Sequence, residues 1–225
     1  MIRRILCIAS TSIEAESLKK VPGLVAHPSG YRYGELDIEL LVTGVGAAAT
    51  IFGISKWLSC NKVPDLVINA GIAGSFNPLI KIGDVVMPAS DCFADVGVED
   101  GDNFFTLSEA GIISGNEFLF KDNFIYCDNS FCKQLTSIAK PAKAITVNTA
   151  TGSELTKKKL VAKFNPDIET MEGAAFFYVC SLEKIPFIAL RAISNMVEKR
   201  DKSKWNIQLA LNNLTIKFTE ILETL

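Results

Sequence analysis

The stretch Val67–Ser90 reads VINAGIAGSFNPLIKIGDVVMPAS and contains the end of one apolar run and the beginning of another. Short apolar runs rich in β-branched residues and bounded by glycine predict strands over about 65–70 and 83–88. Because glycine adopts backbone angles that other residues avoid, Gly71 and Gly74 predict a sharp turn where the first strand ends. Backbone amides exposed in such a turn can hold the polar edge of a ligand. The stretch therefore predicts two sheet strands joined at a candidate binding turn.

Strand and helix patterns alternate along the chain on both sides of this stretch. Further strands are predicted at about 3–10, 36–43, 143–149 and 186–194, and helices at about 47–60, 130–139, 155–164, 173–183 and from about 205 onward. The last helix carries one apolar face, made of Ile207, Leu211, Leu214, Phe218, Ile221 and Leu225. This alternation predicts an α/β fold with a largely parallel or mixed sheet covered on both faces. Ligands bind such sheets beyond the carboxyl ends of the strands.

Length and composition favour one domain spanning residues 1–225. The chain has 225 residues, is 48% apolar and carries a formal net charge of −2, without a repeat or a linker-like segment. Lys and Arg are interleaved with acids, so no basic stripe indicates a nucleic-acid partner. No apolar segment approaches the ~20 residues of a membrane-spanning helix. The apolar run in MIRRILCIAS is too short for a signal peptide, and we expect a cytoplasmic protein.

The six cysteines form no C-x-x-C pair, and His27 is the one histidine that could join them as a metal ligand. They fall mostly inside apolar runs. We therefore expect all six to be small buried apolar residues, with no metal site: Cys7, Cys60, Cys92, Cys127, Cys132 and Cys180.

A glycine motif follows the strand predicted at 36–43. Gly44-x-Gly46-x-x-Ala49 approximates a dinucleotide-binding fingerprint, with Asp65 about 20 residues further on as the acid that would bind ribose. That acid should end a strand, whereas Asp65 begins one. We expect these glycines to form a tight turn at a sugar-facing surface. A non-enzymatic nucleotide-binding module remains the alternative.

The segment DIETMEGAAFFYVC places Met171 and Glu172 just before a strongly apolar helix. An ionised carboxylate only accepts hydrogen bonds and can take two donors, so Glu172 suits a pair of sugar hydroxyls. The thioether of Met171 would lie against the sugar ring. The alternative is that Glu172, and Glu169 before it, merely stabilise the positive end of the helix dipole.

Three segments in this order, NAGIAGSFNPLIKIGDVV, IETMEGAAF and LRAISNMVE, resemble the purine nucleoside phosphorylase and nucleosidase superfamily. The resemblance implies one three-layer α/β/α domain around a twisted mixed sheet, a small nucleoside substrate and a homo-oligomer. The C-terminal segments are most similar to the futalosine hydrolases, which release hypoxanthine from futalosine for menaquinone synthesis. They are also similar to the methylthioadenosine/S-adenosylhomocysteine nucleosidases, and phosphorylase activity remains a further alternative.

The resemblance assigns Glu14 to the attacking water. The turn STSIEAE around it lacks the phosphate-binding arginine of the phosphorylases, which favours water as the nucleophile. Glu14 could instead be a capping acid in a first helical turn. Ile72 stands where the nucleosidases often have serine, and the segment 149–155 resembles the one that covers the base. The sugar cation formed during cleavage is stabilised by carboxylates, so no cofactor or metal is required.

Asn195 is the expected reader of the base. The adenine-specific nucleosidases have an aspartic acid at this position, which can give a proton to N7. An asparagine cannot act as an acid, but its NH₂ can donate to the oxygen of a 6-oxopurine such as hypoxanthine. Alternatively, Asn195 simply ends a strand with a side-chain turn. Further substrate contacts are expected from Ser194, Arg191 and Trp205, the last with Arg200 near the carboxylated aromatic tail of futalosine.

Overall fold

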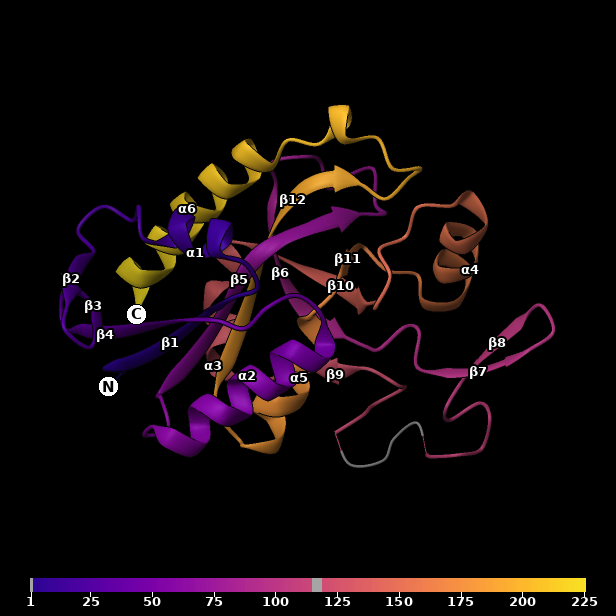
Figure 1. Cartoon of the computed structure of the whole chain (residues 1–225), viewed down its shortest axis with the longest axis horizontal. Coiled ribbons are helices and arrows are strands. Elements are labelled where there is room, and N and C mark those ends of the chain that lie inside the picture. Colours follow the sequence, from indigo (N-terminus) through magenta and orange to yellow (C-terminus); the bar gives the residue numbers. More distant parts are fainter. Residues whose placement is uncertain (1, 115–118) are drawn as a thin grey trace.

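A mixed sheet forms the centre of the protein (Figure 1), which a computed structural model describes over residues 2–114 and 119–225. Within these residues the strand order is β11-β10-β6-β12-β5-β1-β4-β3-β2, and β9 also pairs with β6. The strands are β1 (Arg4–Ala9), β2 (Val25–His27), β3 (Gly30–Tyr33), β4 (Leu36–Val42), β5 (Leu66–Ser75), β6 (Val85–Asp91), β9 (Ile125–Tyr126), β10 (Lys140–Thr146), β11 (Ile168–Thr170) and β12 (Phe187–Met196). A separate hairpin consists of β7 (Gly97–Asp100) and β8 (Asn103–Thr106). Strand β5 pairs in parallel with β1 and β12 but antiparallel with β11, so the predicted mixed sheet is confirmed.

Helices cover both faces of this sheet. Figure 1 shows α1 and α6 on one side and α2 and α5 on the other, and each of these two pairs is in contact. The helices are α1 (Ser12–Leu18), α2 (Ala47–Cys60), α3 (Ser130–Gln134), α4 (Glu154–Phe164), α5 (Gly173–Leu182) and α6 (Ile207–Thr224), with short 3-10 helices at Leu135–Ser137 and Lys202–Lys204. The predicted three-layer α/β/α arrangement is therefore confirmed. In the described residues, no helix combines the length and apolar character needed to cross a bilayer.

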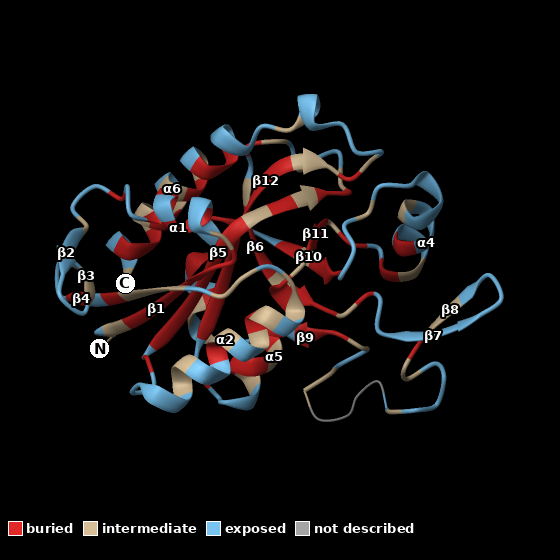
Figure 2. Cartoon of the chain, viewed as in Figure 1, coloured by how far each residue is buried: buried red, intermediate tan, exposed pale blue. Residues whose placement is uncertain are grey.

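The core lies between the sheet and these helices (Figure 2). Helix α5 is apolar on all sides because it is enclosed, and the Phe176 and Phe177 rings pack edge-on against Phe187 of β12 at centroid distances of 5.4 and 4.8 Å. Helix α6 buries one face, as predicted, through Leu214 and Phe218 among others.

Strand β5 corrects the interpretation of Gly71 and Gly74. Neither glycine forms a turn; the strand continues through both to Ser75 and stays paired with β12 as far as Met196. The pairing with β12 and β11 supplies the hydrogen bonds that keep this segment extended. The glycines are needed for a different reason, the close approach of side chains from other elements.

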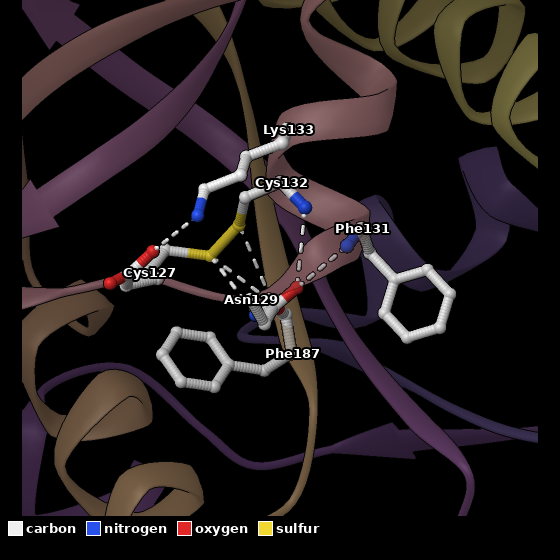
Figure 3. Close-up of a disulfide and its surroundings, with 7 residues drawn as sticks. Cys127, Asn129, Phe131, Cys132, Lys133 and Phe187 are labelled. Atoms are coloured by element: carbon white, nitrogen blue, oxygen red, sulfur yellow. Dashed lines mark hydrogen bonds and ion pairs between the residues drawn. A yellow bond between two sulfur atoms is a disulfide. The ribbon is translucent and has the colours of Figure 1, made fainter.

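The cysteines are also more diverse than predicted. Cys127 and Cys132 form a disulfide, with Cα atoms 6.5 Å apart, that joins the end of β9 to α3 (Figure 3). Asn129 caps α3 by accepting from the amides of Phe131 and Cys132, and the resulting turn brings the two cysteines together. Cys60 is exposed. The expectation of small buried residues holds for the other three: Cys7, Cys92 and Cys180.

Candidate active site

A cavity of about 510 Å³ opens where β1, β5 and β12 end. The residues that line it come from six parts of the chain, namely Ser10, Thr11 and Glu14; Val45; Ile72, Ala73 and Gly74; Ala150, Thr151 and Gly152; Glu169, Thr170, Met171 and Glu172; and Ser194, Asn195, Glu198, Arg200 and Trp205. This is the carboxyl edge of the sheet, where α/β folds bind ligands. Both chain termini lie at the other end of the sheet (Figure 1).

Glu14 is held rigidly in the wall of this cavity. Its Oε2 accepts hydrogen bonds from the Thr11 amide and hydroxyl at 2.9 and 2.7 Å, which completes a capping box at the start of α1. Its Oε1 accepts from the Ile72 amide at 3.0 Å. Glu14 is thus both a helix-capping acid and a cavity residue, and the two readings of the sequence are compatible.

Gly71 makes room for this carboxylate. A Cβ atom at Gly71 would lie 2.7 Å from Glu14 Oε1, which is closer than van der Waals contact permits. Gly71 itself does not line the cavity. The predicted direct contact of Gly71 with the substrate is therefore replaced by an indirect one: Gly71 leaves the space that the Glu14 carboxylate occupies.

Glu172 occupies the N-cap position of α5, but its side chain accepts no hydrogen bond from the first turn of that helix. Its Oε1 accepts from the Gly46 amide at 2.8 Å, and the Ser10 hydroxyl also interacts with it. Gly46 has φ +92°, so the Gly44–Gly46 segment is a turn that aims an amide into the site. Burial raises the pKa of Glu172, opposed by the Gly46 hydrogen bond and by the charge of Arg191.

Arg191 lies beneath the site, outside the cavity lining. It is 2% exposed and donates to the backbone oxygens of Asn69 and Leu190 at 3.0 and 2.8 Å, and to the Asn69 side chain. Its charge lowers the pKa of Glu172 and so favours the ionised form of that carboxylate. Arg191 therefore does not make the expected contact with the substrate, because β12 directs its side chain into the core. Its charge instead acts on the carboxylate of Glu172 from beneath the cavity.

A β-bulge at Ser194 positions Asn195. The β12–β5 register passes from Ile193 opposite Ala73 to Asn195 opposite Gly74, so Ser194 is the extra residue. The Ser194 hydroxyl donates to Asn195 Oδ1 at 2.8 Å, and Asn195 Nδ2 donates to the Met196 oxygen at 3.0 Å. These two bonds fix the orientation of the carboxamide at the cavity surface.

Glu169 was not among the predicted site residues, yet it also lines the cavity. It is 7% exposed, and its carboxylate accepts from the amide of Thr151 at 2.8 Å and from the hydroxyl of the same residue. It does not bond to the first turn of α5, so the dipole interpretation misplaced it. Burial raises the pKa of Glu169, and its bonds to Thr151 oppose that shift. Its strand, β11, has three residues, too few to show a period in the sequence.

The remaining predicted contacts lie around the same cavity. Met171 and Gly74 line it. Arg200 and Trp205 line the outer part of the cavity, where the Arg200 guanidinium lies 5.7 Å from the centroid of the Trp205 ring. Over residues 2–114 and 119–225, no group of three or more His, Cys, Asp or Glu side chains is arranged to hold a metal. The site thus offers carboxylates, backbone amides, a carboxamide and a thioether.

Residues 8–225 match the family model described as "Phosphorylase superfamily". The chain belongs to this superfamily. Among curated members, it is 29% identical over 202 residues to the futalosine hydrolase of Streptomyces coelicolor, with 86% of this chain and 80% of that one covered. It is 28% identical over 210 residues to the 5'-methylthioadenosine/S-adenosylhomocysteine nucleosidase of Buchnera aphidicola, covering 88% and 82%.

Solved structures of superfamily members share the whole fold. The native futalosine hydrolase of Helicobacter pylori strain 26695 superposes with a TM-score of 0.82 at 17% identity, covering 100% of this chain and 99% of that one. The H. pylori methylthioadenosine/S-adenosylhomocysteine nucleosidase superposes with a TM-score of 0.80 at 17% identity and complete coverage of both chains. At these identities the likeness establishes the fold.

Proposed function

We propose that this protein is a nucleosidase that hydrolyses the N-glycosidic bond of futalosine and releases hypoxanthine. The choice of hypoxanthine as the base rests on one observation: Asn195 lies at the cavity surface, and Ser194 orients its carboxamide. The proposal also agrees with the superfamily to which the chain belongs and with the 29% identity to a futalosine hydrolase.

The two fixed carboxylates supply the chemistry of bond cleavage. As the bond to the base breaks, the sugar becomes an oxocarbenium-like cation, which negative charge stabilises. Glu172 accepts hydrogen bonds from the sugar hydroxyls and lies beside that cation. Glu14 orients the attacking water and takes its proton. The amides of Ile72 and Gly46 hold the two carboxylates in place before the substrate arrives.

The charges that line the cavity suit water better than phosphate as the attacking group. Of the residues that line it in the described part of the chain, Arg200 is the single cation, and it sits over Trp205 at the outer part. Around Glu14 the side chains are hydroxyls and a carboxylate. A phosphate dianion at that position would meet Glu14 without a cation in contact with it, because Arg191 lies beneath the cavity and donates to Asn69 and Leu190.

Asn195 suits a 6-oxopurine. Asn195 Nδ2 donates one of its two hydrogens to the Met196 oxygen, so the second N–H remains as a donor for a ligand. Hypoxanthine has an acceptor at O6 and another at N7, whereas adenine has a donor at position 6. In the outer part, Arg200 and Trp205 offer a cation and an aromatic ring to the carboxylated tail of futalosine.

An adenine-directed nucleosidase is the second candidate, supported by the 28% identity to a 5'-methylthioadenosine/S-adenosylhomocysteine nucleosidase. The test is to incubate the purified protein with futalosine, inosine and methylthioadenosine, with and without phosphate, and to identify the free base by chromatography. We expect hypoxanthine from futalosine without phosphate. Adenine release, or a requirement for phosphate, contradicts the proposal. The Asn195→Asp variant should lower the kcat/KM ratio of futalosine to methylthioadenosine, with Ser203→Ala on an exposed turn as control.

A further inference from the structure

We infer that Glu169 is a second specificity-determining residue, which accepts the N1–H group of a 6-oxopurine while Asn195 donates to the neighbouring O6. This inference rests on the proposed function and specifies how the same cavity recognises the base. It concerns a residue that the sequence pattern assigned to the dipole of α5.

The sheet register places Glu169 and Asn195 on the two sides of one glycine. Glu169 of β11 pairs with Gly74 of β5, and Asn195 of β12 pairs with Gly74 from the opposite side. Directly paired residues point to the same face of a sheet. With neighbouring strands about 4.8 Å apart, the Cα atoms of Glu169 and Asn195 are about 10 Å apart. The row Glu169, Gly74 and Asn195 therefore forms one side of the cavity, to which all three contribute.

Gly74, in the middle of this row, has no side chain, and the carboxamide of Asn195 reaches over it. A Cβ atom at Gly74 would lie 3.2 Å from Asn195 Nδ2 and 2.9 Å from Val197 Cγ2. The donor group of Asn195 therefore lies toward the middle of the row, on the side of Glu169.

The bonding of Glu169 leaves capacity for a ligand. Thr151 contributes one hydrogen bond to each carboxylate oxygen. Each oxygen has two lone pairs, so two acceptor positions remain. Holding Thr151 does not require a charge, and burying one is unfavourable unless it is compensated. In the described residues every ion pair of a Lys or Arg is made with an acid other than Glu169, and the charge that acts on the pKa of Glu169 is that of another acid, Asp95, which raises it. A ligand N–H group supplies the missing compensation.

The two side chains together distinguish the purine bases. Hypoxanthine carries a donor at N1 and an acceptor at O6, which match an acceptor-only carboxylate and the NH₂ of Asn195. Adenine carries an acceptor at N1 and a donor at position 6, so both contacts would be mismatched. Glu169 thus adds a discrimination that Asn195 alone does not provide.

The test is calorimetric titration of hypoxanthine, 1-methylhypoxanthine and adenine into the wild type, Glu169→Gln and Thr151→Val. Wild type should bind hypoxanthine about ten- to a hundredfold more tightly than the 1-methyl compound, as for a hydrogen bond to a charged group. In Glu169→Gln this ratio should fall to within a few-fold of one. Thr151→Val, which removes one bond to the same carboxylate, should keep the ratio. If steric exclusion of the methyl group were responsible, the ratio would persist in Glu169→Gln.

Two outcomes overturn the inference: an unchanged ratio in Glu169→Gln, or an equal loss of hypoxanthine and adenine binding in that variant. The melting temperature of each variant shows whether it is folded. Hypoxanthine release from futalosine by the wild type is measured separately. Release combined with either of those outcomes removes Glu169 as a base reader and leaves the proposed function standing. Adenine preference in both binding and release overturns both.

Discussion

At the scale of single residues, backbone amides fix the positions of the two carboxylates that we propose to be catalytic. Glu14 and Glu172 come from different parts of the chain. One oxygen of Glu14 accepts from the amide of Ile72, and one oxygen of Glu172 accepts from the amide of Gly46. An amide held by secondary structure cannot rotate away as a side chain can. The two acids are therefore preorganised, which is the condition for electrostatic stabilisation of a developing cation.

Removing either charge should impair turnover more than folding. For Glu14→Gln and for Glu172→Gln we expect kcat to fall by about 10²- to 10⁴-fold, the range for a lost acid–base group. Glutamine keeps the shape and one acceptor oxygen, so Glu172→Gln should melt near the wild type. Both oxygens of Glu14 accept from amides, so in Glu14→Gln the NH₂ group faces one of those donors and the melting temperature should fall without loss of the fold. Glu16→Gln, on the exposed side of the same helix α1, is the matched control. Rates within threefold of wild type would remove the corresponding assignment.

Asp91 should make stability depend on pH. It is fully buried, its Oδ1 accepts from Thr146 at 3.0 Å, and its Oδ2 has no partner among the described residues. Burial raises its pKa from 3.8 to about 7. Between these values the folded protein retains a proton that the unfolded chain has lost, so the free energy of unfolding falls as the pH rises.

Asp91→Asn tests this dependence, because asparagine keeps the acceptor and does not titrate. At about 1.4 kcal/mol per pH unit, the wild type should lose about 2 kcal/mol more than the variant between pH 5.5 and 8. Urea denaturation at the two pH values measures the difference. Parallel losses in both proteins would mean that Asp91 titrates near its ordinary pKa.

At the scale of elements, β5 and β12 carry most of the site geometry. Both have ten residues, they pair along nearly their whole length, and the bulge at Ser194 shifts the register just where the cavity begins. Without the bulge, Asn195 would point to the opposite face. The bulge also places Gly74 against Asn195 and Val197, which makes this glycine sensitive to substitution.

Gly74→Ala should therefore damage both stability and base recognition. The added methyl group meets Val197 and Asn195 at 2.9 and 3.2 Å, and overpacking of this kind costs about 1–3 kcal/mol. We expect a lower urea midpoint and a reduced kcat/KM. Gly152→Ala is the matched control, since it lines the same cavity and an added Cβ meets nothing within 4 Å. Equal behaviour of the two variants would contradict the packing argument.

Element length decides what sequence patterns could predict. The long strands and α2, α4, α5 and α6 have enough residues to show a period, and they occur where they were predicted to within about three residues, except that β5 continues five residues beyond its predicted end. Helix α1 has seven residues and β11 has three, so neither was predicted. The position of Glu169 depends on the pairing of β11 with β5, a contact between distant segments that no local pattern encodes. Glu172 was identified from its position before a strongly apolar helix, and Glu14 and Asn195 through the resemblance. The inward direction of Arg191 follows from the register of β12.

At the scale of the whole molecule, the site exists only when the sheet is complete. Its walls come from segments between Ser10 and Trp205, and they meet at one edge of the sheet. We expect loss of activity and loss of far-UV circular dichroism to coincide in urea, as in a cooperative transition. Activity lost at a clearly lower urea concentration than the helical signal would indicate that the site opens before the fold.

The hydrogen bond between Ile72 and Glu14 uses only the main-chain amide of Ile72, so the side chain at position 72 is not needed to hold the carboxylate. The main chain of Ile72 holds the carboxylate, while its side chain lines the cavity. Every amino acid except proline supplies the same N–H group. Position 72 is accordingly a natural starting point for directed evolution: a library there can reshape the chamber for altered nucleosides while Glu14, the proposed catalytic acid, stays anchored.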